Sequence, residues 1–327
     1  MDCGLTPQNF FKTFTGISTL QYIGIVFRLE SRTKLIAMSV SRPSRVKVAY
    51  IYFKRFLRWR RNSNPYISGD AFSDMADFVF NPPKWRNFNG RKSISTAEVI
   101  FCKGEELSLL FELYGDQIKA KVVITGNSDF EFHEVPKNIP ASIRAMFLQN
   151  SFISDNKFIF TVPIGIENFR LGVNGNPRFI RPKNKNGKSS ARVLFGPLSA
   201  THPVRELVID RFRALDARWD LLTSRLSPRD YDQIASTYKY IAAVRGNGVD
   251  THRLWESLYR GLTPVVVRDD WWRSLEHLYP QVAVISDWTY SELDRIILNR
   301  IQVESPQSCE TLWMPFWKNK IVEFLID

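Results

Sequence analysis

A glycine-containing turn, Arg245–Gly248 (RGNG), holds the residues best suited to bind a charged ligand. It follows an apolar run, Tyr238–Val244, that predicts a buried strand, and its glycines permit close approach of the backbone. Asp250 or Thr251 can cap the helix predicted over Asp250–Arg260. Free amides at a helix N-terminus and the helix dipole both favour an anion. The strand, turn and helix together predict a pyrophosphate site.

Two arginines and a glutamate extend this site. Arg245 and Arg253 supply guanidinium donors that suit phosphate oxygens. Arg253 and Glu256 lie three residues apart on one helical face, where Glu256 can accept hydrogen bonds from ribose hydroxyls. The structural alternative is an ion pair between Arg253 and Glu256, with glycines that only turn the chain. The spacing matches neither the GxGxxG of dinucleotide-binding proteins nor the GxxxxGK[ST] of P-loops.

Short apolar runs alternate with helical patterns from about residue 94. They predict strands over Ala97–Cys102, Ala120–Thr125 and Lys157–Val162, and helices over Glu105–Tyr114 and Ile139–Leu148. Continuous apolar strands separated by helices favour parallel pairing with both faces buried. The first part of the chain is therefore predicted to be an α/β domain.

A polar stretch at Gly175–Ser190, rich in Asn, Gly, Lys and Pro, predicts a linker. Beyond it the α/β pattern restarts. The predicted strands are Arg192–Phe195, Tyr238–Val244, Pro264–Val267 and Val282–Ile285. The predicted helices are Pro203–Ala214, Pro228–Ser236, Asp250–Arg260, Trp271–Leu278 and Ser291–Ile301.

These patterns divide the chain into four segments. We expect an irregular N-terminal extension (1–45), an N-terminal acceptor-side α/β domain (46–180), a C-terminal ligand-binding α/β domain (190–301) and a C-terminal tail (302–327). The tail carries an amphipathic helix over Met314–Leu325. The two Rossmann-like domains would face a cleft, with ligands beyond the carboxyl ends of the strands.

The composition is that of a folded basic protein. Of its 327 residues, 44% are apolar and 24% charged, and the net charge is +12. A basic run without an acid lies between Arg42 and Arg61. Such charge suits phosphorylated substrates, an anionic membrane surface or nucleic acid. A basic nucleic-acid-binding protein is the weaker alternative, because no recognisable binding module accompanies the charge.

Cysteine and histidine usage predicts a cytoplasmic protein without a metal site. The three cysteines, Cys3, Cys102 and Cys309, are too far apart for a metal pattern or a disulfide framework. The four histidines show no HxH or HExxH spacing. No apolar run is long enough to span a membrane. Val48–Trp59 reads as an element of the first domain or as a surface helix on anionic lipid, so peripheral attachment stays open.

The segment RGNGVDTHRLWESLYRGLTPVVV, Arg245 to Val267, resembles the exostosin-type glycosyltransferases and their bacterial relatives. Their pattern is roughly G-x-G-x-D-x-x-R-x-W-E-x-L-x-x-G-x-x-P-V-V. Other blocks also resemble these proteins, so that the resemblance runs from about Asn64 to Ile301. These blocks are Asn64–Phe80, Thr125–Phe132, Phe147–Asn150, Val162–Asn168 and Ser236–Tyr240.

The resemblance implies a GT-B fold and the transfer of a sugar from a nucleotide-sugar donor to a glycan or lipid-linked acceptor. No cofactor is implied, and positive side chains with a helix N-terminus would stabilise the leaving diphosphate in place of a metal. Asp269 and Asp270 have no spacer and read as a helix cap rather than a DxD motif. The donor site implied by the resemblance comprises Lys239, Arg245, Asn247, Asp250, Arg253 and Glu256.

An inverting transfer needs a base that deprotonates the acceptor hydroxyl. The loop after Ala120–Thr125 offers Asp129 first, then Glu131 and His133, although each can equally be a solvated loop residue. Relatives often carry a histidine where Gly126 stands. This departure keeps a catalytically inactive relative open as an alternative function.

Overall fold

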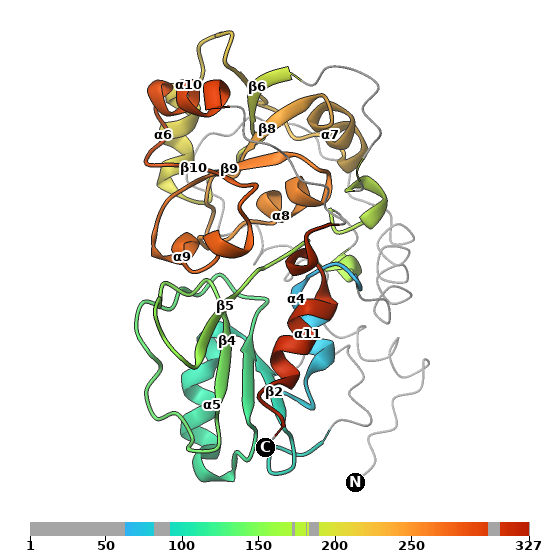
Figure 1. The fold of residues 1–327 in the computed structure, drawn as a ribbon, viewed down its shortest axis with the longest axis vertical. Helices are drawn as coiled ribbons and strands as arrows, with labels where there is room; N and C mark the ends of the chain where they lie inside the picture. Colours follow the sequence, from blue (N-terminus) through green and yellow to red (C-terminus); the bar gives the residue numbers. More distant parts are fainter. Residues whose placement is uncertain are drawn as a thin grey trace, which may run out of the picture. The chain divides into compact units, whose positions relative to one another are not determined.

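The computed structural model in Figure 1 describes residues 63–81, 92–171, 174–180, 182, 190–299 and 308–326. Within these ranges the chain forms two five-stranded sheets whose strand pairs are all parallel. Both sheets belong to one compact unit, Ile51–Asp327. The extension predicted over 1–45 and the element predicted over Val48–Trp59 lie outside the described residues.

The first sheet has the order β1-β2-β3-β4-β5. Its strands are β1 (Phe78–Val79), β2 (Val99–Cys102), β3 (Val122–Thr125), β4 (Ala145–Gln149) and β5 (Ile159–Val162). Every residue of β2, β3 and β4 is buried, as a parallel sheet covered on both faces requires. The parallel α/β arrangement predicted from the continuous apolar runs is confirmed.

The helix predicted over Ile139–Leu148 is wrong. Ala145–Gln149 is instead β4, which pairs with β3 on one side and β5 on the other. Ala, Met and Leu are good helix formers, so the local sequence favoured a helix. Burial between two strands decides the outcome, because the run is short and apolar on both faces.

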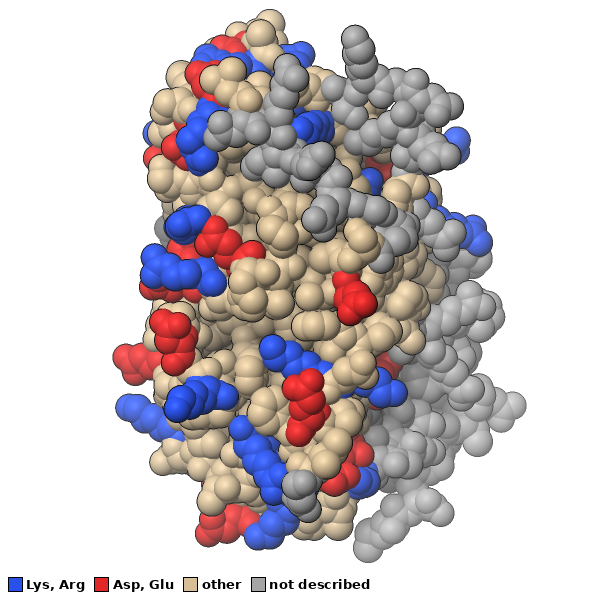
Figure 2. Space-filling view, in the orientation of Figure 1, with Lys and Arg blue, Asp and Glu red and all other residues tan. Residues whose placement is uncertain are grey.

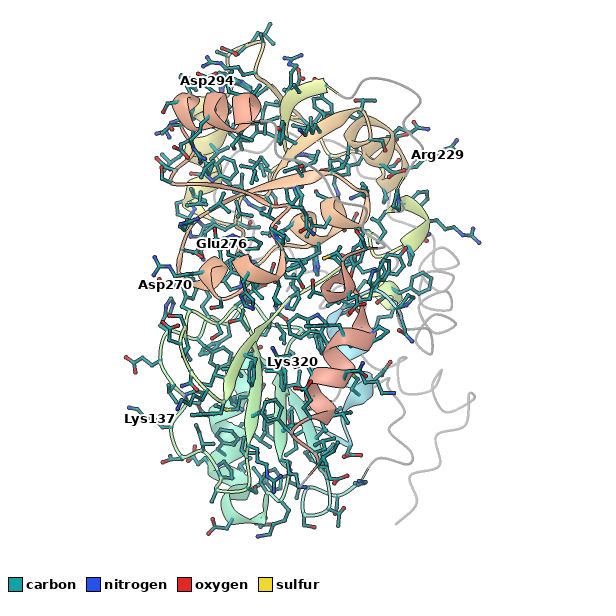
Figure 3. All side chains as sticks on the ribbon, in the orientation of Figure 1. Lys137, Arg229, Asp270, Glu276, Asp294 and Lys320 are labelled. Carbon is teal, nitrogen blue, oxygen red and sulfur yellow. The ribbon has the colours of Figure 1, made fainter. Side chains whose placement is uncertain are left out.

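Helices cover both faces of the first sheet. On one face α5 (Leu107–Tyr114), which follows the 3₁₀ turn η1 (Gly104–Glu106), packs against alternate residues of β2 to β4. On the other face lie α4 (Gly69–Met75) and α11 (Met314–Val322) (Figure 1). The C-terminal tail thus contributes Met314, Trp317 and Ile321 to the core of the first sheet. Lys320, labelled in Figure 3, places its ammonium 4.8 Å from the ring centroid of Phe160.

The second sheet has the order β10-β9-β8-β6-β7. Its strands are β6 (Ser190–Phe195), β7 (Trp219–Leu221), β8 (Tyr238–Ala242), β9 (Thr263–Val267) and β10 (Ala283–Ile285). Four of them were predicted, and β7 was not. β7 is a short edge strand that contains Asp220, so it lacks the apolar run by which the others are recognised.

Helices also flank both faces of the second sheet. α6 (Pro203–Arg211) and α10 (Tyr290–Asn299) pack on one face, and α7 (Pro228–Ala235) and α8 (His252–Tyr259) on the other. α9 (Asp270–Arg273) follows β9 and joins the α8 cluster. No helix in the described part of the chain is both long and apolar enough to cross a membrane. On the face shown in Figure 2, basic and acidic residues are interspersed.

Candidate functional site

The loops that follow the carboxyl ends of the strands in the two sheets contact each other. Arg245, after β8, donates from Nη2 to Oε1 of Glu131 at 2.5 Å. Asn247 donates from Nδ2 to Oδ2 of Asp129 at 3.2 Å. Residues predicted for two different roles, donor binding and proton transfer, therefore lie together. Loops beyond the carboxyl ends of parallel strands are where open α/β sheets bind ligands.

Gly248 allows the turn after β8 to approach the segment after β4 closely. A Cβ at this position would lie 2.9 Å from Nδ2 of Asn150, in the segment after β4. The amide of Asp250 donates to Oδ1 of the same asparagine at 3.1 Å. Any side chain at residue 248 would push Asn150 away, so glycine is required here for contact rather than for turning.

Asp250 connects the loop after β5 to the start of α8. Its carboxylate accepts from the amide of Ile164 and from Nε1 of Trp255, both at 2.7 Å. Burial raises its pKa to about 7, although both hydrogen bonds favour the ionised form. Only 4% of the residue is exposed. The structure therefore places this predicted donor-site residue in the contact between the part of the chain that carries the first sheet and the part that carries the second, the two halves of the molecule.

Sequence reasoning missed Arg205, a residue of α6 that holds the turn after β8. Its Nε donates to the carbonyl of Arg245 at 2.8 Å, and its Nη2 to the carbonyl of Val244 at 3.1 Å. Burial, and then the charge of Arg253, lower its pKa to about 10. Arg253 itself donates to the carbonyl of Pro197 at 2.9 Å.

Three arginines, Arg205, Arg245 and Arg253, gather at this edge of the second sheet, where Asp269 also lies near Arg245. Neither Arg205 nor Arg253 forms an ion pair with a carboxylate in the described ranges. His202 accepts the amide of Val204 through Nδ1 at 3.2 Å, and burial together with the charge of Arg245 lowers its pKa. Two arginines without a carboxylate partner and a histidine whose pKa is lowered make this edge suited to bind an anion.

Glu256 lies in a buried ion-pair network. Its side chain is 11% exposed, and its Oε2 lies 3.4 Å from Nη1 of Arg260. Arg260 also pairs with Asp232 of α7 at 3.2 Å. The alternative prediction paired Glu256 with Arg253, but Arg253 forms no such pair in the described structure and packs over the ring of Tyr231.

Lys239 lies near the amino end of β8, with its ammonium 5.1 Å from the ring centroid of Tyr240. Parallel strands rise about 3.3 Å per residue, so it lies roughly 15 to 20 Å from Arg245. The structure does not bring this residue to the turn.

The loop that carries Asp129 is held firmly. Gln149 and Asn150 both donate to the carbonyl of Ser128, at 2.8 and 3.1 Å. Asn168 donates to Oδ1 of Asn127 at 2.6 Å. Gln149 and Asn150 thus hold the backbone at Ser128, and Asn168 holds the side chain of Asn127, so that the position of Asp129 in the loop is defined.

The other two base candidates differ in their surroundings. The side chain of Glu131 is 18% exposed because Arg245 covers it. His133 is 64% exposed, lies 3.5 Å from Glu131 and stacks on Phe152 with ring centroids 4.5 Å apart. At Gly126, a Cβ would lie 3.1 Å from the ring of Phe101, so a larger side chain there would require that ring to move.

A cavity of about 360 Å³ lies beside this loop. Small-molecule sites commonly enclose about 300 to 1,000 Å³. Amides, a hydroxyl, two carboxylates, a guanidinium and an imidazole line its wall. Its polar lining residues are Glu105, Asn127, Ser128, Asp129, Asn168, Arg170 and His252. Within the described ranges, no group of three or more His, Cys, Asp or Glu side chains is placed to hold a metal ion.

No family model matches the chain, and no curated protein matches it. Among solved structures, the chain is similar to one described as "Crystal Structure Analysis of the Glycotransferase of kitacinnamycin". The TM-score is 0.32 and the identity 11%, over 93% of this chain and 86% of that chain. The resemblance of Arg245–Val267 to exostosin-type enzymes therefore stays a prediction.

Proposed function

We propose that this chain is a glycosyltransferase of GT-B architecture. It binds a nucleotide-sugar at the carboxyl edge of the second sheet and transfers the sugar to a hydroxyl held in the cavity at the carboxyl edge of the first. The contact between Arg245 and Glu131 carries the proposal, because a guanidinium, a group suited to phosphate oxygens, follows a strand of one sheet and lies beside a carboxylate from the other.

The diphosphate of the donor would replace Glu131 as the partner of Arg245. Thr251, at the N-cap of α8, makes no side-chain cap hydrogen bond, so the first turn of this helix can receive an anion. Arg253 lies in the same turn. Together these groups would stabilise the charge that develops on the leaving nucleoside diphosphate, the largest electrostatic demand of the reaction.

Glu256 is proposed to bind the ribose. Among the described residues only its Oε2 has a partner, Arg260, which leaves Oε1 for a ribose hydroxyl. Asp250 and Lys239 take no part in this arrangement, since one is buried between the halves and the other lies along β8. We further propose that the acceptor is a glycan or a lipid-linked molecule at an anionic membrane surface, and that the basic stretch 47–61 contacts this surface.

Thermal denaturation with UDP, GDP, CMP and their sugars tests the donor site. A ligand that binds only the folded state raises the melting temperature, with about 2.7 kcal/mol of stabilisation at a concentration one hundred times its dissociation constant. Arg245→Gln should abolish the shift, and Lys239→Gln, in the strand β8 that precedes the turn, should preserve it. Failure of every nucleotide to raise the melting temperature would refute the proposal. Turnover of the bound donor then separates an active enzyme from an inactive relative.

A further inference from the structure

His252 is the one cavity-lining residue that comes from the second half of the molecule. It is the first residue of α8 and shares the cavity wall with Asp129 and Asn127. A group in this position lies between the proposed donor site, at the start of α8, and the proposed acceptor site. It would therefore contact both reactants.

The hydrogen bond of His252 fixes which ring nitrogen carries the proton. Nδ1 lies 2.8 Å from the carbonyl oxygen of Gly165. A carbonyl only accepts, so Nδ1 donates, and in the neutral ring Nε2 is then unprotonated. None of the described residues pairs with Nε2. The imidazole is thus oriented with a free basic nitrogen.

Gly165 holds its carbonyl in a fixed place. The segment pairs antiparallel with Ser68, and the amide of Ile166 donates to the carbonyl of Ile67 at 2.9 Å. Gly165 has φ +67° and a Cβ there would lie 2.1 Å from that carbonyl oxygen, so only glycine fits. A ring held by rigid backbone is preorganised for proton transfer.

We propose that His252 is the base that deprotonates the acceptor hydroxyl, an assignment that rests on the proposed function. The acceptor O–H bond breaks and its proton moves to Nε2, while the oxygen bonds to the anomeric carbon. The bond from that carbon to the diphosphate oxygen breaks, and its electron pair leaves with the nucleoside diphosphate. The imidazolium is stabilised by the carbonyl of Gly165 and returns its proton to water after product release.

The other candidates suit this step less well. Glu131 is paired with Arg245, and His133 is exposed and stacked on Phe152. Asp129 lines the cavity, but its Oδ2 already accepts from Asn247. We assign Asp129 to hold the acceptor and to favour the positive imidazolium across the cavity.

The test uses the full-length protein and the nucleotide-sugar that raises its melting temperature. Water is the first acceptor, followed by a panel of methyl glycosides. His252→Asn retains an amide donor where Nδ1 stands but has no basic nitrogen. We expect kcat to fall by about 10² to 10⁴, the usual contribution of a general base, with an unchanged dissociation constant for the nucleotide. Added imidazole should restore activity to His252→Ala, a response that a purely structural role cannot give.

The nucleotide-induced melting shift of each variant shows that it is folded. A kcat for His252→Asn within roughly threefold of the parent would overturn the assignment, since a general base contributes far more. So would a large loss in Asp129→Asn combined with no imidazole rescue of His252→Ala. If the parent protein turns over no nucleotide-sugar at all, the proposed function fails and this assignment fails with it.

Discussion

Arg245 and Glu131 form the closest ionic contact between the carboxyl edges of the two sheets, with Nη2 and Oε1 2.5 Å apart. The two side chains are 30% and 18% exposed, so water screens the pair and its contribution is modest, at about 1 kcal/mol or less. A diphosphate offers Arg245 more acceptor oxygens and more charge than one carboxylate does. Glu131 therefore competes with the proposed ligand.

Glu131→Gln should strengthen nucleotide binding. Removing the competing charge leaves Arg245 available to phosphate, and the pair energy corresponds to roughly a two- to fivefold lower dissociation constant. Isothermal titration with the nucleotide selected by thermal denaturation measures this. Glu134→Gln, an exposed change in the same loop, is the matched control. An unchanged or weaker affinity in Glu131→Gln alone would show that the two do not compete.

Arg205→Lys should weaken nucleotide binding without unfolding the protein. Lysine cannot reach the carbonyls of Val244 and Arg245 with two separate nitrogens, so the turn that presents Arg245 loses its support. Loss of one or two such bonds predicts roughly a tenfold weaker affinity. Arg213→Lys, exposed just beyond α6, should bind normally. Equal affinities for both variants would remove Arg205 from the site.

Gly248→Ala should destabilise the fold by about 1 to 3 kcal/mol, the usual cost of overpacking. The new methyl would collide with the side chain of Asn150, 2.9 Å away, and press the two carboxyl edges apart. Urea unfolding measures the loss. Adding Asn150→Ala removes the collision partner, so the double variant should lose less than the sum of the two single changes. Strict additivity would mean that the collision is not the cause.

Asp250 should make stability fall as pH rises. Its pKa is about 7 in the folded protein against an ordinary value of 3.8, so between these two pH values the folded state binds a proton that the unfolded state does not. Its stabilising contribution is complete below about pH 4 and is lost as pH rises through 7. At 1.36 kcal/mol per pKa unit, the change is about 4 kcal/mol at most.

Asp250→Asn cannot titrate and loses at least one of the hydrogen bonds that the carboxylate accepts. The free energy of unfolding of the variant should therefore be lower than that of the parent at pH 5 and closer to it at pH 8. Urea unfolding across this range gives the comparison, and Asp270→Asn, an exposed carboxylate labelled in Figure 3, is the control. A difference between parent and Asp250→Asn that does not vary with pH would contradict the assignment.

The parallel sheets were predictable because their strands are apolar on both faces. β4 was not, since its Ala-Met-Phe-Leu run suits a helix and only its neighbours β3 and β5 make it a strand. At the site, too, the local sequence indicates where residues lie but not which role each one has. Arg245, Asn247, Asp129 and Glu131 follow strands and so come to the carboxyl edges together. Which of them acts on a substrate stays a prediction.

The positions of two residues of the candidate site, Arg205 and His252, could not be predicted from the sequence, because each is set by a contact with a distant part of the chain. Arg205 gains its place from carbonyls about forty residues away, a relation that no local pattern contains. His252 lies inside the motif, but its hydrogen-bond partner, the carbonyl of Gly165, comes from the part of the chain that carries the first sheet, so the motif alone does not reveal its orientation. Its position in the first turn of the helix that follows the turn predicted to bind a ligand is the signal in the sequence that points to it.

The return of α11 to the first sheet sets the order in which the protein can form on the ribosome. Met314, Trp317 and Ile321 are at most 5% exposed and complete one face of a sheet whose strands end at Val162. The part of that face that α11 covers stays exposed while the whole second half is synthesised. The second sheet, made from one continuous stretch, has all of its strands and flanking helices by Asn299, whereas the half translated earlier must wait for its last helix, α11. During that interval the nascent chain exposes apolar surface that chaperones would shield.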